Sequence, residues 1–424
     1  MRKIFFFSLI AGILVIGIFS LASSDIDKKR KTDLFQQVKL FSDTLAIVQN
    51  EYVEEVDFRT LIYGALRGMV SSLDPHSQFM DPDTYNELKI DTEGKFGGLG
   101  IEITVKDGLL TIVTPIEDTP AWKAGLKPND RIVKINNEIT RAMTLAEAVK
   151  KLRGKPQEAV EITVLRESEN KIIDFRIVRD IIRIKDIKEA KVIQDAIAYI
   201  RLVEFRENTP QELEKALEKL KKEGMNGLIL DLRNNPGGLL DVAVKVAEKF
   251  IPNDKLIVST KGRKNTQNME FISHAQNPVI DMPMAVLINE GSASGSEIVA
   301  GCLQDYNRAI ILGVKSFGKG SVQTVIPLRD GSALRLTTSL YFTPQGKKIH
   351  GKGVMPDITV ENAKLEPAEE KKIPEKTTEE IFEEIEKAPK AEKPDLEYKK
   401  DNQLMRGLDT LKALLIYGAK IQKK

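Results

Sequence analysis

Residues 285–300 read Ala-Val-Leu-Ile-Asn-Glu-Gly-Ser-Ala-Ser-Gly-Ser-Glu-Ile-Val-Ala, an apolar run that passes through small residues into a helical pattern. The apolar run predicts a buried strand, and the small residues predict a sharp turn from that strand into a helix. Such a turn exposes a serine hydroxyl, and the first amides of the helix can stabilise an oxyanion. The plainer interpretation is a serine-rich turn that only caps the helix. In either case, a strand that leads directly into a helix indicates an α/β core.

Strands and helices continue to alternate on both sides of this stretch. Between residues 168 and 360 we expect strands at 196–203, 227–232, 284–289 and 309–312, and helices at 210–223, 239–250 and 297–304. This alternation predicts an α/β core with a mainly parallel sheet. In such a core, ligand chemistry lies in the turns beyond the carboxyl ends of the strands.

The composition limits what that chemistry can be. The 424 residues are enough for two or three domains, and 64 Lys and Arg against 62 Asp and Glu give a net charge of +2. This balance lacks the basic excess that favours nucleic-acid binding, so no nucleic-acid partner is expected. The single cysteine, Cys302, excludes an intramolecular disulfide and a cysteine-rich zinc module. Three histidines, His76, His274 and His350, leave little material for imidazole chemistry.

A serine nucleophile in the turn at 289–296 needs a general base. The histidines lie in a turn or in polar connections with no paired carboxylate evident, so the sequence does not favour a Ser-His-Asp triad. A neutral lysine can take the same role when its amine is kept away from water. Lys319 lies between glycines, Phe317 and Val322 would exclude water from its amine, and Gln323 would orient it. A solvated lysine is the plainer interpretation.

The segment around this lysine nearly spells a phosphate-binding loop. Residues 313–319 fit G-x-x-x-x-G-K, but Gly320 stands where a magnesium-binding Ser or Thr is required. The residues that follow are β-branched and predict a strand, whereas a phosphate loop leads into a helix. Nucleotide hydrolysis is therefore not expected.

A second turn offers further oxyanion donors. The predicted strand at 228–232 ends in Arg-Asn-Asn-Pro-Gly-Gly, residues 233–238. The amides of Gly237 or Gly238 would form the second half of an oxyanion hole. A plain Asn-Pro-Gly-Gly turn is the alternative interpretation.

Residues 94–167 have a different character. Their short alternating strands predict a small β-rich domain, with helix candidates at 120–124 and 145–152. A glycine loop at 97–101 enters the first strand. Successive amides in such a loop can bind a carboxylate, and the neighbouring strand edge can accept an extended peptide. Taken alone, a glycine loop is more often a bulge than a ligand site.

Two motifs of this domain resemble those of a PDZ domain. They are G-L-G-I at 98–101 and A-G-L-K-P-N-D-R-I at 124–132, in which Asn129 replaces the usual glycine. Asparagine tolerates the left-handed backbone that this position needs. The resemblance implies a loop that binds a peptide carboxylate, formed by Gly98, Leu99, Gly100 and Ile101.

The N-terminus has the layout of an export signal. Positive residues at 2–3 precede an apolar run at 4–21. Because that run is long enough to cross a bilayer as an uncleaved helix, residues 1–22 are either a cleaved signal peptide or an N-terminal membrane anchor. We therefore expect an exported protein, located in the periplasm or on the extracytoplasmic face of the inner membrane of a bacterium.

Helical and polar segments flank the two domains. Residues 33–93 show helical spacing of apolar side chains and predict an N-terminal helical region. Residues 361–402, rich in Glu, Lys and Pro, predict a charged linker. Residues 403–424 predict an amphipathic C-terminal helix that packs on the body of the protein. The alternative for this helix is a homodimer held together by the N- and C-terminal helices.

Four motifs together resemble the carboxyl-terminal processing proteases, also called tail-specific proteases. They are D-L-R-N-N-P-G-G-L at 231–239, G-S-A-S-G-S-E-I-V-A-G-C-L-Q-D at 291–305, F-G-K-G-S-V-Q at 317–323 and G-V-M-P-D at 353–357. They occur in the family's order, behind a PDZ domain in its usual place. Gly295 and Cys302 stand where the family has alanine, and both replacements are small.

This resemblance implies a catalytic site. It places the nucleophile at Ser294, the general base at Lys319 and the residue that orients the lysine at Gln323. The backbone oxyanion donors that it implies are Gly295 and either Gly237 or Gly238. No cofactor and no metal are expected.

The resemblance implies a multidomain serine endopeptidase that cleaves exported proteins near flexible, apolar C-termini. The PDZ domain would bind the C-terminal tail of the substrate and gate activity, and Arg153 is the candidate for transmitting that docking. An alternative of a different class is a non-catalytic PDZ adaptor or chaperone whose protease core only holds peptides. The intact Ser294, Lys319 and Gln323 argue against this alternative.

Overall fold

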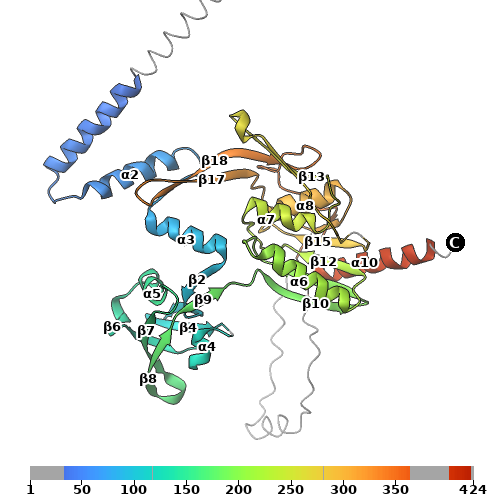
Figure 1. Cartoon of the computed structure of the whole chain (residues 1–424), viewed down its shortest axis with the longest axis horizontal. Helices are drawn as coiled ribbons and strands as arrows, with labels where there is room; N and C mark the ends of the chain where they lie inside the picture. The colour runs from blue at the N-terminus through green and yellow to red at the C-terminus, as the bar shows by residue number, and fades with distance from the viewer. Residues whose placement is uncertain (1–32, 117, 280, 363–400, 422–424) are drawn as a thin grey trace, which may run out of the picture. The chain divides into compact units, whose positions relative to one another are not determined.

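The computed structural model describes residues 33–116, 118–279, 281–362 and 401–421 (Figure 1). The export signal predicted at 1–22 and most of the charged linker predicted at 361–402 lie outside these residues. Within the part of the chain that is described, no helix has both the length and the apolar character needed to span a bilayer.

The chain divides into two compact units. One contains the residues up to Asp81 together with Pro327–Arg335. The other contains Pro82–Ile326 and the residues from Leu336 onward.

The first unit contains much of the predicted helical region. Residues 33–51 form a helix, and α2 (Phe58–Ser71) follows, beginning at the capping carboxylate of Asp57. A short strand that the sequence analysis did not predict, β1 (Gln78–Met80), pairs antiparallel with the start of β18 (Ala333–Phe342). Three residues are too few to show an alternating pattern in the sequence, so this strand depends on its long-range partner.

The second unit begins with α3 (Pro82–Glu93) and continues into a PDZ-like domain. The helices of this domain, α4 (Pro120–Ala124) and α5 (Leu145–Leu152), lie at the predicted residues. Its strands are β2 (Lys95–Gly98), β3 (Ile101–Lys106), β4 (Leu109–Pro115), β5 (Arg131–Ile135), β6 (Glu138–Ile139), β7 (Ala159–Arg166), β8 (Lys171–Val178) and β9 (Asp180–Arg183). The main sheet has the order β3-β4-β5-β7-β8, and β2 pairs with β9.

The sheet of the PDZ-like domain extends past the boundary that the sequence suggested at residue 167. Strand β8 pairs antiparallel with β7 along the whole length of both strands, so the sheet continues to Val178. A left-handed residue, Asn170 with φ 48°, lets the chain turn back between them. Asn129 also adopts the left-handed conformation, with φ 67°, as its place in the motif required.

A largely parallel sheet forms the α/β core. Its strands, in spatial order, are β10 (Ile187–Gln194), β11 (Ile197–Leu202), β12 (Gly227–Asp231), β15 (Met284–Ile288), β16 (Ile310–Gly313) and β19 (Ile358–Thr359). Strand β10 pairs antiparallel with β11, and the other neighbours pair in parallel. The predicted alternation of strands and helices is therefore confirmed for β11, β12, β15 and β16, because parallel neighbours need a crossover and a helix lies in each of these three crossovers.

Helices cover both faces of this sheet (Figure 1). On one face, β12 residues Leu228 and Leu230 share a core with α6 (Thr209–Lys222), α7 (Leu240–Glu248) and α8 (Gly295–Asp305).

The opposite face of the sheet carries the C-terminal helix. There, Ile229 and Leu287 pack with Leu404, Leu408 and Leu411 of α10 (Asn402–Ile421). The C-terminal helix thus packs on the body of the protein, as its amphipathic pattern favoured.

The chain forms a second sheet, which is antiparallel and separate from the parallel one. Strand β18 pairs with β13 (Leu256–Gly262), which in turn pairs with β14 (Met269–Ile272). Strand β17 (Ser321–Pro327) pairs with β18. Lys319, which the resemblance implied as the general base, lies just before the hairpin of β17 and β18.

Candidate active site

Two turns meet at one edge of the parallel sheet. Strands β12 and β15 are neighbours, so their carboxyl ends and the turns that follow lie at the same edge. The turns are held together by a reciprocal pair of bonds: Asn234 N donates to Asn289 Oδ1 at 2.8 Å, and Asn289 Nδ2 donates to Asn234 Oδ1 at 2.9 Å. The two turns, which are far apart in the sequence, therefore form one site.

The serine at the end of the second turn has an unusual backbone. Ser294 has φ 54° and ψ −113° and directly precedes α8. A non-glycine residue in this region costs on the order of 1–3 kcal/mol, and such strain is found at functional sites. Gly237, with φ 99°, lies against it: a Cβ atom added there would be 2.6 Å from Ser294 Cβ and 2.7 Å from Gly295 N. Only a glycine fits this close approach.

The neighbouring serines of the turn have structural partners. Ser292 Oγ donates to Leu232 O at 2.7 Å, and Ser296 Oγ donates to Asn235 O at 2.9 Å. Both residues are fully buried. Ser294 is half-buried, and its hydroxyl contacts a phenol rather than a main-chain carbonyl. Among these serines, Ser294 has the hydroxyl best suited to attack a substrate.

The glycine turn after β12 is fixed by its own hydrogen bonds. Gly237 N donates to Asn235 Oδ1 at 2.9 Å, and Asn235 Nδ2 donates to Leu202 O at 2.9 Å. Phe205 N donates to Gly237 O, and Leu239 N donates to Phe205 O, each at 2.9 Å. The amide of Gly237 is therefore already engaged within the protein.

A buried carboxylate joins the serine turn to the lysine segment. Glu297 Oε2 accepts hydrogen bonds from Ser294 N at 2.9 Å and Lys319 N at 2.8 Å. Its Oε1 accepts from Gly318 N at 2.7 Å and Ser316 Oγ at 2.5 Å. Burial raises the pKa of Glu297, while these four hydrogen bonds act in the opposite direction. The carboxylate thus sets the distance between the backbone of Ser294 and that of Lys319.

Sequence reasoning missed the role of Glu297, although a signal was present. A Ser followed by Glu three residues later is the pattern of a helix N-terminus at which the glutamate reaches back to the first amide. Tyr341 was also missed. Its hydroxyl lies 3.1 Å from Ser294 Oγ and 2.5 Å from Lys319 O, across 47 and 22 positions of sequence. No local pattern predicts such a contact.

The other predicted residues lie on the connection into β17 and at the start of that strand. Lys319 is half-buried, and Val322 packs against the core, but Phe317 is 63% exposed. The expectation that Phe317 shields the amine is therefore wrong, because its side chain points to solvent. Gln323 Nε2 donates to Ser321 Oγ at 3.1 Å, so its carbonyl oxygen remains an acceptor for a cation.

The PDZ-like domain has a groove at its predicted binding loop. A cavity of about 160 Å³ lies between the start of β3 and helix α5. Its lining comprises all four predicted loop residues, together with Phe96, Ile103, Leu145, Val149, Leu152 and Arg153. The Arg153 guanidinium lies 4.5 Å from the centre of the Phe96 ring and forms an ion pair with Glu87 of α3. The groove is thus apolar with one cation at its edge.

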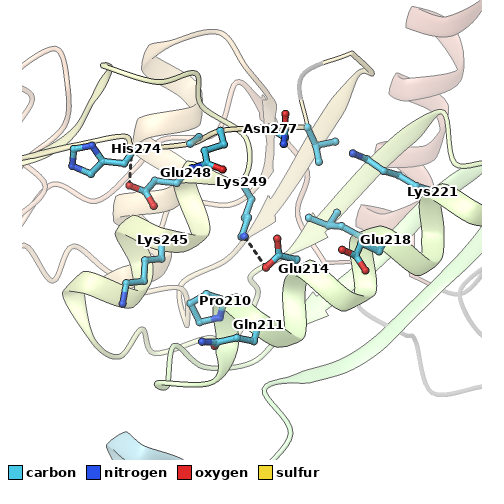
Figure 2. Close-up of a pocket in the computed structure, with 14 residues that line it drawn as sticks. Pro210, Gln211, Glu214, Glu218, Lys221, Lys245, Glu248, Lys249, His274 and Asn277 are labelled. Atoms are coloured by element: carbon cyan, nitrogen blue, oxygen red, sulfur yellow. Dashed lines mark hydrogen bonds and ion pairs between the residues drawn. The ribbon is translucent and has the colours of Figure 1, made fainter.

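A larger cavity of about 540 Å³ lies beside α6 and α7 (Figure 2). Several of its charged side chains interact with the protein itself: Lys249 Nζ lies 3.2 Å from Glu214, and Glu248 accepts a hydrogen bond from His274 N at 2.9 Å. The cavity contains His274 but none of the residues that meet at Ser294. Size therefore does not identify the reactive site here.

Comparison with known proteins agrees with this architecture. Residues 196–360 match Peptidase family S41, residues 111–166 match the PDZ domain and residues 19–84 match the activating protease CtpB N-terminal domain. The chain is 44% identical over 364 residues to a carboxy-terminal-processing protease of Bartonella bacilliformis, covering 85% of this chain and 83% of that protein. It is 36% identical over 359 residues to a probable CtpA-like serine protease of Staphylococcus aureus, covering 84% and 71%.

A solved structure is also similar. The photosystem II D1 C-terminal processing protease is 30% identical, with a TM-score of 0.45 over 73% of this chain and 84% of that one. The matches in sequence extend over the helical region, the PDZ domain and the α/β core in one order. The chain therefore belongs to peptidase family S41, among the carboxy-terminal processing proteases that carry a PDZ domain.

Proposed function

We propose that this protein is a serine endopeptidase in which Ser294 is the nucleophile, Lys319 the general base and Gln323 the residue that orients the lysine. The observation that carries the proposal is that the hydroxyl of Ser294 differs from those of its two neighbouring serines in its hydrogen bonds and its backbone. Ser292 and Ser296 donate to main-chain carbonyls, whereas Ser294 lies on a strained turn at the start of a helix. Glu297 links the backbone of Ser294 to that of Lys319.

The reaction follows from these positions. Ser294 Oγ forms a bond to the peptide carbonyl carbon while its proton passes to the neutral Lys319 amine. The resulting ammonium gives the proton to the leaving amine as the C–N bond breaks, which leaves an acyl ester on Ser294. Lys319, neutral again, then accepts a proton from the water that attacks this ester, and returns it to Ser294 Oγ as the C–O bond to the serine breaks and the acid product leaves. Activity is therefore lost at acid pH, where the lysine is protonated.

The oxyanion of each tetrahedral intermediate needs two amide donors. We assign them to Gly295, the first residue of α8, and to Gly238. Between the two glycines of the turn, Gly238 is preferred because the Gly237 amide already donates to Asn235. Gly237 is required for another reason, since any side chain there would collide with Ser294.

Substrates would be exported proteins with flexible, apolar C-termini. The groove lined by Gly98 to Ile101 and by α5 is apolar and about 160 Å³ in volume, suited to one aliphatic side chain. The amides of the loop would bind the terminal carboxylate, and the edge of β3 would take up the tail as an added strand.

Converting the substrate's C-terminal carboxylate to an amide tests this recognition. We expect kcat/KM to fall by about ten- to a hundredfold, mainly through KM, because the charge-assisted hydrogen bonds to the loop are lost. The measurement is the rate of cleavage of one unfolded protein prepared as the acid and as the amide. A substrate that keeps its free C-terminal carboxylate but ends in aspartate should also be cleaved slowly, because its last side chain is charged and the groove is apolar. Equal rates on acid and amide would refute the carboxylate-binding loop.

Replacing Arg153 with alanine tests whether docking gates the active site. Arg153 lies at the groove and is paired with Glu87 of α3, so a docked carboxylate would compete for its guanidinium. We expect the ratio of acid to amide cleavage to shrink by about fivefold or more, the low end of allosteric coupling. Lys150→Ala is the control, since Lys150 also pairs with α3, at Asp83, but does not line the groove. An unchanged ratio in Arg153→Ala would remove Arg153 from this role.

We also propose export and self-association. Export rests on the charged and apolar pattern of residues 1–22, and N-terminal sequencing of the mature protein distinguishes a cleaved signal from a retained anchor.

A homodimer would use the N- and C-terminal helices. The helix at 33–51 exposes Leu34, Phe35 and Val38 by more than half, and α10 exposes Tyr417 by 66%. Light scattering of the purified protein measures this association.

A further inference from the structure

Tyr341 connects the two halves of the proposed dyad. It lies on β18, is 2% exposed, and places its hydroxyl oxygen 3.1 Å from Ser294 Oγ and 2.5 Å from the main-chain oxygen of Lys319. Its own amide donates to Gly320 O at 3.0 Å, which anchors the residue after the lysine. The phenol is therefore held in place from its backbone and cannot move without shifting the lysine segment.

The directions of these hydrogen bonds follow from counting protons. A phenol has one proton to donate, and a main-chain carbonyl can only accept. The short contact to Lys319 O therefore uses the proton of Tyr341. The contact to Ser294 is then a hydrogen bond only if Ser294 Oγ donates and the phenol oxygen accepts. In this arrangement the serine proton points to Tyr341 and not to a base.

We propose that Tyr341 is a positioning residue that fixes the Ser294 hydroxyl and the Lys319 backbone as one hydrogen-bonded group. This proposal rests on the function proposed above, in which Ser294 is the nucleophile. The phenol holds the serine in one rotamer, aimed at the site between the two turns, before substrate arrives. Pre-orientation of this kind lowers the barrier to attack because less freedom is lost in the transition state.

The phenol does not act as a base. Burial raises the pKa of Tyr341 above its ordinary value, so it keeps its proton at the pH at which a lysine base works. When the serine proton turns toward the Lys319 amine, the phenol proton can turn from the Lys319 carbonyl to Ser294 Oγ. The phenol then donates to Ser294 Oγ instead of accepting from it, the Lys319 carbonyl gives up this one hydrogen bond, and the tyrosine neither gains nor loses a proton.

The test is the rate at which a fluorophosphonate labels Ser294 in Tyr341→Phe. This reagent reacts at the serine and needs no tail in the PDZ groove. We expect the maximal first-order labelling rate to fall about tenfold or more, because one orienting hydrogen bond is lost. The reagent concentration that gives half of this maximal rate should stay unchanged. For a protein substrate, kcat should fall by a similar factor while KM stays the same. Rates are normalised to the labelled endpoint, so that only folded protein is compared.

Tyr306→Phe is the matched control. Tyr306 follows α8, and its hydroxyl also donates to a main-chain carbonyl, that of Leu256 at 2.9 Å, so its variant loses a bond of the same kind. We expect its normalised labelling rate to equal that of the wild type. The proposal is overturned if Tyr341→Phe labels as fast as the wild type or faster, or if both variants slow equally. Labelling of the wild type at a residue other than Ser294 would instead refute the proposed nucleophile, and peptide mapping separates these results.

Discussion

Replacing Ser294 with alanine is expected to lower kcat/KM on an unfolded protein with an apolar C-terminus by about 10⁴-fold or more. No nearby hydroxyl can substitute, because Ser292 and Ser296 donate to main-chain carbonyls within the two turns. Lys319→Ala should cause a loss of similar size, since the serine then has no base. The double variant should be no less active than either single one, because two residues that act as a unit do not contribute additively. The measurement is the initial rate at which new N-termini appear.

Ser296→Ala is the comparison for the dyad variants. It removes a buried hydroxyl two residues further on, in the first turn of α8, so we expect a stability loss of about 1 kcal/mol and less than about a tenfold loss of cleavage. Equal cleavage by the wild type, Ser294→Ala and Lys319→Ala would show that the dyad is wrong. Binding without cleavage by all of them, the wild type included, would favour the non-catalytic adaptor.

Glu297→Gln is expected to damage both stability and catalysis. Both carboxylate oxygens accept two hydrogen bonds: one oxygen from Ser294 N and Lys319 N, the other from Gly318 N and Ser316 Oγ. In either orientation, the amide nitrogen of glutamine would face at least one of these N–H donors and leave it unsatisfied. We expect the free energy of unfolding to fall by about 2–4 kcal/mol and kcat to fall by about a hundredfold or more. Urea denaturation and cleavage kinetics at a temperature where the variant is folded measure the two effects.

Glu212→Gln separates this effect from the general cost of neutralising a buried carboxylate. Burial also raises the pKa of Glu212, and one of its oxygens accepts from Asp186 N at 3.1 Å and Ile187 N at 3.3 Å. A glutamine can keep both bonds with its carbonyl oxygen, so we expect less than about 1 kcal/mol of destabilisation and nearly normal kcat. Wild-type kcat in Glu297→Gln would contradict the positioning role of that carboxylate.

Much of the fold could be predicted because the relevant signals are local. Helix α5 begins and ends at the predicted residues, since its apolar spacing and its capping box, Thr144 with Glu147, lie within one short segment. The strand, turn and helix around Ser294 were predictable for the same reason. That the sheet continues past residue 167 could not be predicted, because whether β8 joins it depends on its pairing with β7, and the sequence of β8 alone does not show that pairing.

The sequence by itself determined the chemistry that is available: three histidines, one cysteine, a turn rich in serine, the glycine pair at 237–238 and Lys319 after a strand. Only the tertiary structure decided how these groups are used. It directs the Ser296 hydroxyl to Asn235, 61 positions away, and brings Tyr341 to Ser294 across 47. Hydrogen bonds are short and directional, so they depend on which strands become neighbours, and that neighbourhood is set by long-range packing rather than by any local pattern.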